Sequence, residues 1–172
     1  MARNTKQRSH RFLISLIAAT FTVAGGCANR HAGTTSMESD QAAMRNDVAR
    51  ILDAQAEAWN RGDIEDFMEH YWKSDALTFS GGGKTVRGWA ATLDRYKQRY
   101  PTREKMGQLR FDIDRVQVLG ETAALVLGRY HLTIGDETPQ GNFSLVFERI
   151  DGRWCIIHDH TSHLPTPAVG GE

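Results

Sequence analysis

The stretch GRWCIIHDHTSH at residues 152–163 decides the fold. It follows Asp151, and an Asp-Gly pair is the strongest short signal for a hairpin turn. The run from Trp154 to Ile157 favours a strand and has no helical spacing. Because strand side chains alternate, one face is expected to carry Trp154, Ile156, His158, His160 and Ser162. That face starts apolar and ends in hydrogen-bonding groups, which predicts that it borders a cavity.

Three further strands are expected before this one. Apolar and charged residues alternate from Leu109 to Asp114, and after Arg115 the apolar phase shifts by one residue. A slip of this kind is typical of a β-bulge, which bends a sheet. Residues 123–134 and 143–148 supply the next two strands, and short turns join all four. The pattern therefore predicts an antiparallel meander over the second half of the domain.

Helices are expected in the first half. Apolar residues recur at helical spacing in 39–60, with Ser39 as the cap and Gly62 after the end. Asp63 is expected to cap a second helix that carries Tyr71 and Trp72 at its end. A hairpin over 75–86 turns at three glycines. A third helix then runs from Gly88 to Pro101, with Trp89, Leu93, Tyr96 and Tyr100 on its packed side and a solvated face that includes Arg95 and Arg99.

Segregated helices and an antiparallel meander are typical of an α+β domain with its helices on one face of the sheet. We expect three helices packed on a curved, mostly antiparallel sheet. A bent sheet over helices of unequal length leaves a cone-shaped space beneath it. Residues 39–163 form this domain, and residues 164–172, which contain two prolines, are expected to be a disordered tail.

The N-terminus has the pattern of a targeting segment. Residues 1–11 are basic, residues 12–24 are apolar but too short to span a bilayer, and small residues lead directly to Cys27. This order resembles the lipobox of bacterial lipoproteins. The resemblance implies a signal peptide over 1–26, cleavage before Cys27, acylation of that cysteine with palmitate or a similar chain, and a flexible tether over 27–38. The alternatives are an ordinary secretory signal and a single membrane anchor.

The same resemblance implies the periplasmic side of a bacterial membrane. Because Ala28 rather than Asp follows the cysteine, we expect the outer membrane. Cleavage would remove four basic residues and no acid from a chain with 21 of each, leaving 17 basic residues against 21 acidic ones. This balance provides no electrostatic footprint for nucleic acid. With Cys27 lipidated, Cys155 has no partner for a disulfide and is expected to be a core residue.

Several segments of the domain resemble the nuclear transport factor 2-like superfamily, in its SnoaL-like branch. These are WNRGD at 59–63, YWKSDALTFSGGG at 71–83, RGW at 87–89 and DGRWCIIHDHTS at 151–162. The last is also similar to the end of the calcium/calmodulin-dependent protein kinase II association domain. The resemblance implies the cone-shaped fold and a homodimer formed through the open sheet face. It does not choose a function, because this fold hosts enzymes, binding proteins and assembly modules.

Enzymes of the superfamily include ketosteroid isomerase, scytalone dehydratase, limonene epoxide hydrolase and SnoaL-type cyclases. These enzymes work inside the cone without a metal, and they use Asp, His, Tyr or Arg for proton transfer and oxyanion stabilisation. None of their catalytic sets can be placed onto this sequence residue by residue. We therefore assign no cofactor and no metal.

His158 and His160 are the first candidates for chemistry. A neutral imidazole can pass protons or bind a carboxylate, so this pair is the catalytic candidate if the protein is an enzyme. The alternatives are two structural histidines, or a metal site with His131 as a third ligand.

Arg129 is the other candidate, because it shares a strand face with Leu125, Leu127 and His131. A charge among buried positions needs an anionic ligand or an acid such as Glu148 or Asp112. The leading hypothesis is a lipid-anchored domain that binds a small, anionic or aromatic molecule in the cone. The predicted ligand-binding residues are Tyr71, Trp72, Phe79, Trp89, Arg129, His131, His158 and His160. The alternatives are a cofactor-free acid/base enzyme (an isomerase, dehydratase or hydrolase) and a dimerisation or assembly module.

Overall fold

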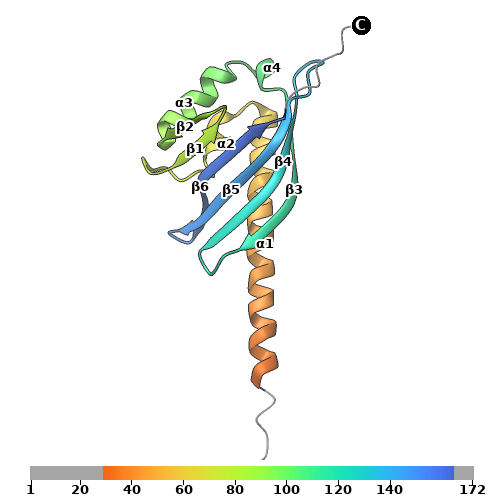
Figure 1. Cartoon of the computed structure of the whole chain (residues 1–172), viewed down its shortest axis with the longest axis vertical. Coiled ribbons are helices and arrows are strands. Elements are labelled where there is room, and N and C mark those ends of the chain that lie inside the picture. Colours follow the sequence, from red (N-terminus) through yellow and green to blue (C-terminus); the bar gives the residue numbers. More distant parts are fainter. Residues whose placement is uncertain (1–28, 165–172) are drawn as a thin grey trace, which may run out of the picture.

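The computed structural model describes residues 29–164, with side chains from Glu38 onward. Figure 1 shows a curved sheet with one long helix against one face and shorter helices at its upper end. The predicted signal peptide, Cys27 and residues 165–172 lie outside the described part. Within that part, no helix is both long enough and apolar enough to cross a membrane.

The first half of the domain is mainly helical. It comprises α1 (Asn29–Arg61), α2 (Ile64–Met68), the hairpin of β1 (Thr78–Gly81) and β2 (Lys84–Arg87), α3 (Trp89–Arg99) and α4 (Arg103–Met106). Gly62, with a φ of 87°, follows α1, and the Asp63 carboxylate caps α2 by accepting a hydrogen bond of 2.9 Å from the Asp66 N–H. The capping residue and the helix stop that the sequence predicts are therefore confirmed.

One boundary is wrong. The helix α1 begins at Asn29 and not at Ser39, so the segment expected to be a flexible tether is helical from Asn29 onward. No proline lies between these two positions to interrupt a helix. Burial nevertheless begins late in α1, since Met44 is half-buried and Val48 is its first buried residue.

The second half of the domain consists of four long antiparallel strands. They are β3 (Gln108–Val118), β4 (Ala123–Thr133), β5 (Gln140–Ile150) and β6 (Arg153–His163). With the hairpin they form a 6-stranded sheet in the order β2-β1-β6-β5-β4-β3, in which only β1 and β6 pair in parallel. The curved, mostly antiparallel sheet of an α+β domain is thus confirmed.

Two β-bulges shape the sheet. The first lies in β3 between Ile113 and Arg115, where the sequence predicts it. The second lies in β6, where Phe147 pairs with Ile156 but the preceding Val146 pairs with His158, so that Ile157 is an extra residue. No shift of the apolar phase in the sequence predicts this second bulge. Because a one-residue insertion reverses the alternation, every residue of β6 after Ile157 changes face.

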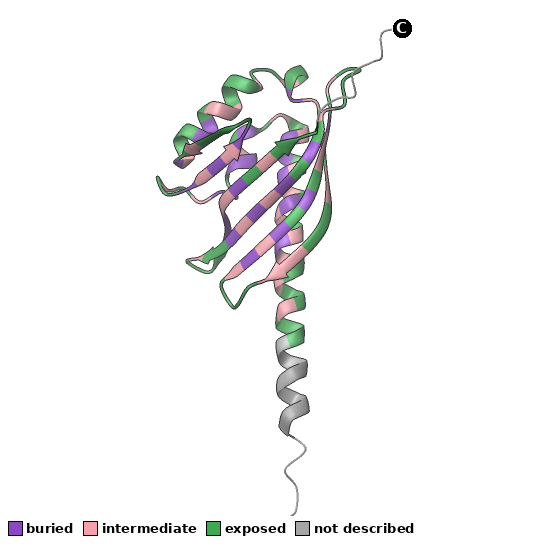
Figure 2. Ribbon diagram, viewed as in Figure 1, coloured by how far each residue is buried: buried purple, intermediate pink, exposed green. Residues whose placement is uncertain are grey.

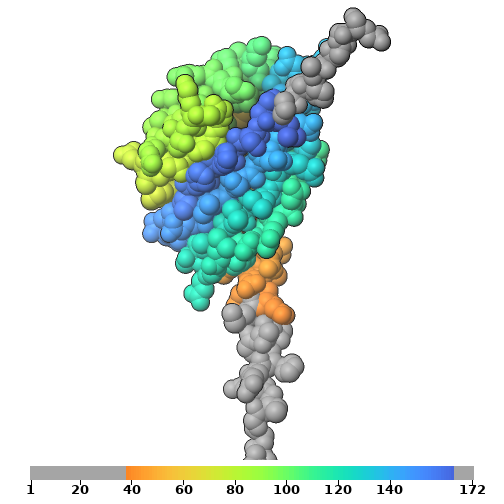
Figure 3. Space-filling view, viewed as in Figure 1, coloured from red at the N-terminus to blue at the C-terminus, as the bar shows by residue number. Residues whose placement is uncertain are grey.

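The core lies between the inner face of the sheet and the helices, as the buried positions along the strands show (Figure 2). Leu52 of α1, Met68 of α2, Phe147 of β5 and Ile156 of β6 are among its fully buried members. The space-filling view in Figure 3 shows β6 (dark blue) crossing the outer surface beside the hairpin (yellow-green). Part of β6 therefore contacts solvent on one face and the domain interior on the other.

Candidate functional site

A cavity of about 200 Å³ lies between the inner face of the sheet and α3. Its walls are mostly aromatic. The helices contribute Trp59, Phe67 and Tyr96, Tyr100 follows the end of α3, and the strands contribute Phe79, Phe111, Tyr130 and Phe143. The volume is below the range of roughly 300–1,000 Å³ that is typical of ligand pockets. The space therefore fits a small molecule only.

Two glycines make room for the rings of the sheet wall. A Cβ atom at Gly128 of β4 would lie 2.5 Å from Cζ of Phe143. A Cβ atom at Gly141 of β5 would lie 2.8 Å from Cε1 of Tyr130 and 1.9 Å from a backbone oxygen of β6. Since real Cβ atoms do not approach other atoms this closely, both ring positions depend on glycine.

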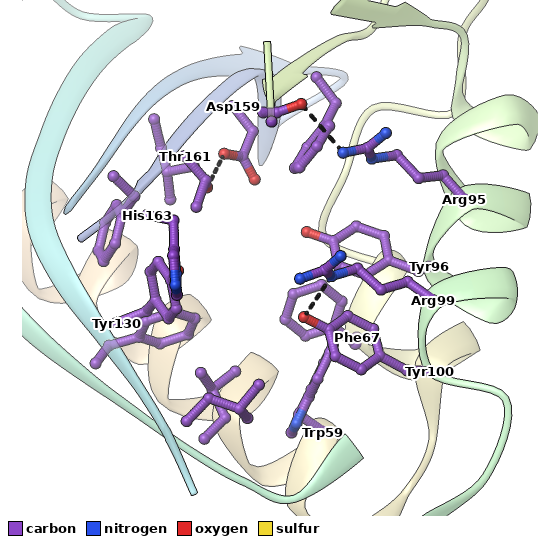
Figure 4. Close-up of a pocket in the computed structure, with 18 of the residues that line it drawn as sticks. Trp59, Phe67, Arg95, Tyr96, Arg99, Tyr100, Tyr130, Asp159, Thr161 and His163 are labelled. Carbon is purple, nitrogen blue, oxygen red and sulfur yellow. Dashed lines mark hydrogen bonds between the residues drawn. The ribbon is translucent and has the colours of Figure 1, made fainter. Parts of the chain in front are cut away.

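Asp159 of β6 is the acidic residue that lines this cavity (Figure 4). It is 3% exposed, and it pairs with Phe79 on one side and Leu145 on the other, both of which also line the cavity. The Tyr71 hydroxyl donates a hydrogen bond of 2.7 Å to Oδ2, and the Thr161 hydroxyl donates one of 2.9 Å to Oδ1. The carboxyl therefore has two protein donors but no ion-pair partner within the described residues.

The backbone explains why Tyr71 reaches this carboxyl. The Ile156 N–H donates to the His70 carbonyl and the Trp72 N–H donates to the Ile156 carbonyl, each at 2.9 Å. The segment after α2 thus pairs with β6 immediately before the bulge. Tyr71 lies between these two hydrogen bonds, and its side chain is 3% exposed.

The electrostatic environment favours a neutral carboxyl. Burial raises the pKa of Asp159 from 3.8 to about 6, although the hydrogen bonds from Tyr71 and Thr161 lower it. Burial also raises the pKa values of Tyr71 and Tyr96 well above 10, and the charge of Asp159 raises them further. The cavity therefore holds an acid that can exchange a proton near neutral pH beside phenols that remain protonated.

The rim of the cavity is polar. Arg95 and Arg99 reach it from α3, and His163 reaches it from the end of β6 (Figure 4). The ring nitrogen Nδ1 of His163 forms a hydrogen bond of 3.0 Å with the Tyr130 hydroxyl. The helix face that the sequence analysis expected to be solvated therefore contributes two cavity residues, because Arg95 and Arg99 lie next to Tyr96 and Tyr100.

Two of the predicted ligand-binding residues, Tyr71 and Phe79, line the cavity. Trp72 and Trp89 are half-buried but do not line it, and the indole Nε1 of Trp89 donates to the Met68 carbonyl at 2.9 Å. Neither tryptophan therefore contributes to the cavity wall as predicted, and for Trp89 the hydrogen bond to α2 is the physical reason.

The prediction that the histidine pair faces the cavity is wrong. The bulge at Ile157 turns His158 and His160 to the outer face and turns Asp159 inward. Nδ1 of His158 lies 2.6 Å from the Thr78 hydroxyl. The pKa of His158 is lowered mainly by burial and, to a smaller extent, by the charge of the neighbouring His160. His160 is exposed. The acid–base role that was assigned to this pair therefore has no geometric basis inside the cone.

Arg129 and His131 also lie on the outer face. Arg129 is exposed and pairs with Asp114 at 3.3 Å, and Nε2 of His131 lies 2.8 Å from Oδ2 of Asp112. The expected acid partner of Arg129 is thus present on the neighbouring strand, although it is neither Glu148 nor Asp112. The inner face of β4 carries Tyr130 instead. Among the described residues, no three His, Cys, Asp or Glu side chains are grouped closely enough to hold a metal ion.

Comparison with known proteins gives the family. The model of the SnoaL-like domain matches residues 48–167, which is more than half of the chain. The chain belongs to the SnoaL-like domain family. A solved NTF-2 like protein of unknown function from Shewanella oneidensis MR-1 is 42% identical to it, with a TM-score of 0.67, over 69% of this chain and 98% of that one.

More distant structures share the fold of this SnoaL-like domain. A ketosteroid isomerase-like protein from Erwinia carotovora atroseptica SCRI1043 is 17% identical, with a TM-score of 0.60, over 70% of this chain and 96% of that one. A putative calcium/calmodulin dependent protein kinase II association domain from Xanthomonas campestris is 18% identical, with a TM-score of 0.55, over 69% of this chain and 86% of that one. No protein of curated function matches the chain.

Proposed function

We propose that this SnoaL-like domain binds a small organic molecule in the aromatic cavity, with Asp159 as its inner polar contact. One observation carries the proposal: a buried carboxyl that has no cation partner in the described part of the chain faces an aromatic cavity. Burying a carboxyl without a cation partner costs free energy, and pKa values shifted by burial cluster at functional sites. An assembly module would gain more from a filled core.

The same carboxyl supports a second candidate, an acid/base enzyme of the isomerase type. A general base works best when its pKa lies near the operating pH, and the pKa of Asp159 is about 6. Asp159 would take a proton from one atom of the substrate and return it to another, while Tyr71 keeps the carboxylate oriented. The ketosteroid isomerase-like structure with the same fold is consistent with this chemistry. Asp159 thus replaces the histidine pair as the catalytic candidate.

Native mass spectrometry of the purified full chain tests the binding proposal. We expect a co-purified small molecule on the wild-type protein. Thr161→Phe would fill the cavity and should remove this mass, whereas Ser162→Phe, on the exposed outer side of the same strand, should retain it. A wild-type protein that carries no adduct and binds none from a metabolite extract contradicts the proposal.

We further propose that the mature protein is a lipoprotein on the periplasmic side of a bacterial membrane, anchored through Cys27. The support is the basic, apolar and small-residue order of residues 1–26. Expression with an alkyne analogue of palmitate should label the wild type and not Cys27→Ser, and only the wild type should sediment with membranes. Equal labelling or equal sedimentation contradicts the anchor.

We also propose that the protein forms a homodimer through the outer face of the sheet. Leu127, which is 38% exposed, lies on this face of β4 together with the half-buried Leu125. An apolar surface of this kind is typical of a protein contact. Sedimentation analysis should give a dimer for the wild type and a monomer for Leu127→Glu, and a monomeric wild type contradicts it.

A further inference from the structure

We infer that the ligand of this cavity is a small, flat carboxylate whose anionic group binds Arg95 and Arg99 at the rim. The inference rests on the proposed binding function and assigns the ligand's chemical class. Arg95 and Arg99 lie one turn apart on α3, so their side chains leave the helix on the same side. Both line the cavity, and Figure 4 shows both guanidinium groups directed toward it.

The protein leaves most of their donors unused. Nη2 of Arg95 donates to the Gly81 carbonyl at 3.1 Å, and Nε of Arg99 donates to the Tyr100 hydroxyl at 3.2 Å. A guanidinium has five N–H donors. Among the described residues, neither arginine forms an ion pair with an acid, whereas Lys97 on the same helix pairs with Glu65 at 2.5 Å.

Aromatic rings hold the two guanidinium groups in place. Cζ of Arg95 lies 5.3 Å from the centre of the Phe79 ring, and Cζ of Arg99 lies 5.6 Å from that of Tyr100. Such stacking fixes a planar group while leaving its edge available for a carboxylate. The site is therefore prepared for an anion before the ligand arrives.

Asp159 does not neutralise these cations. Its carboxyl accepts hydrogen bonds from Tyr71 and Thr161, and within the described residues it forms no ion pair with either arginine. The cavity thus has a cationic rim and a separate acidic contact, with aromatic walls between them (Figure 4). A matching ligand has a carboxylate at one end, a flat body, and a hydroxyl or an acidic C–H at the other end to donate to Asp159.

Isothermal titration calorimetry of the full chain with two isosteric probes, 4-hydroxybenzoate and 4-hydroxybenzamide, tests this inference. They differ in charge but hardly in shape. We expect the carboxylate to bind at least about tenfold more tightly, since hydrogen bonds to an ionised group are roughly twice as strong as those between neutral groups. Arg95→Gln and Arg99→Gln should each remove most of this preference. Lys97→Gln, which takes the same charge from the outer side of α3, should change it less than about twofold.

Each contrary outcome has a distinct meaning. Equal affinity of the wild type for the two probes overturns the carboxylate assignment and leaves the cavity as a binding site. The same holds if Lys97→Gln and Arg99→Gln reduce the preference for the carboxylate probe equally. Absence of binding by both probes, in a protein that also carries no small molecule in native mass spectrometry, overturns the inference and the proposed function together. Arg99 is exposed, so Arg99→Gln keeps the test valid if Arg95→Gln misfolds.

Discussion

Replacing Asp159 with asparagine should make the protein more stable at neutral pH. The carboxyl is 3% exposed, and its pKa in the folded state is about 6 rather than 3.8. A raised pKa means that the folded protein binds the proton more tightly than the unfolded chain does. The contribution of this group is therefore complete below pH 3.8 and is lost as the pH rises through about 6.

The magnitude follows from the same values. A difference of about two pKa units corresponds to roughly 3 kcal/mol of unfolding free energy. The asparagine variant does not ionise, so its stability relative to the wild type should increase by roughly 2 kcal/mol between pH 4 and pH 7.5. The amide also gives Tyr71 and Thr161 one oxygen acceptor instead of two, which adds a cost of about 1 kcal/mol at every pH. The informative quantity is therefore the change with pH of the difference in unfolding free energy between the variant and the wild type.

Urea unfolding of the full chain, followed by tryptophan fluorescence at several pH values, measures this change. Asp114→Asn is the matched control, because Asp114 is an exposed carboxylate on the outer face. Asp114→Asn should change the unfolding free energy by less than about 0.5 kcal/mol at each pH. If the stability difference between Asp159→Asn and the wild type is the same at pH 4 and pH 7.5, the carboxyl is not buried as described and the reasoning is refuted.

Three further predictions concern the cavity and its surroundings. Gly141→Ala would place a Cβ atom 1.9 Å from a backbone oxygen of β6 and should destabilise the fold by more than about 2 kcal/mol in urea unfolding; a neutral effect would contradict the packing. Tyr71→Phe removes a hydrogen bond that lowers the Asp159 pKa, so the pKa should rise above about 6 in an NMR titration, and a fall would count against the contact. Replacing both His158 and His160 with alanine should leave 4-hydroxybenzoate affinity within about twofold, because both lie outside the cavity, and a large loss would restore them to the site.

The sequence contains enough periodicity to predict the fold. The alternation in β3, the Asp-Gly turn before β6 and the cap at Asp63 each specify a local structure, and all are present. These features work because each depends on neighbouring residues only. The bulge in β3 could also be predicted, since it separates two clear apolar phases.

The bulge in β6 could not be predicted, and the site depends on it. Trp154, Cys155 and Ile156 are all buried, so this run gives no phase from which the face of the following residues can be counted. The extra residue at Ile157 exchanges the face of Asp159 with that of the histidines. The adjacent Ile156 pairs with the segment after α2 and with β5, and such long-range pairing has no local signature.

The other errors have a similar origin. The strand β4 begins with apolar residues on both faces, so the sequence does not show that Tyr130 faces the interior and that Arg129 and His131 face outward. Charged residues on a helix normally face solvent, so the pattern predicts an exposed position for Arg95 and Arg99. Only the tertiary position of α3 over the open end of the cone brings their guanidinium groups to the ligand space.

The central claim is that Asp159 faces the aromatic cavity while the neighbouring histidines face outward. A carbon-13 NMR titration of the Asp159 side-chain carboxyl in the full chain tests it most directly. The account predicts a midpoint near pH 6 that moves when 4-hydroxybenzoate is added. A midpoint near 3.8 that does not respond to the probe would place this carboxyl in water and contradict the account.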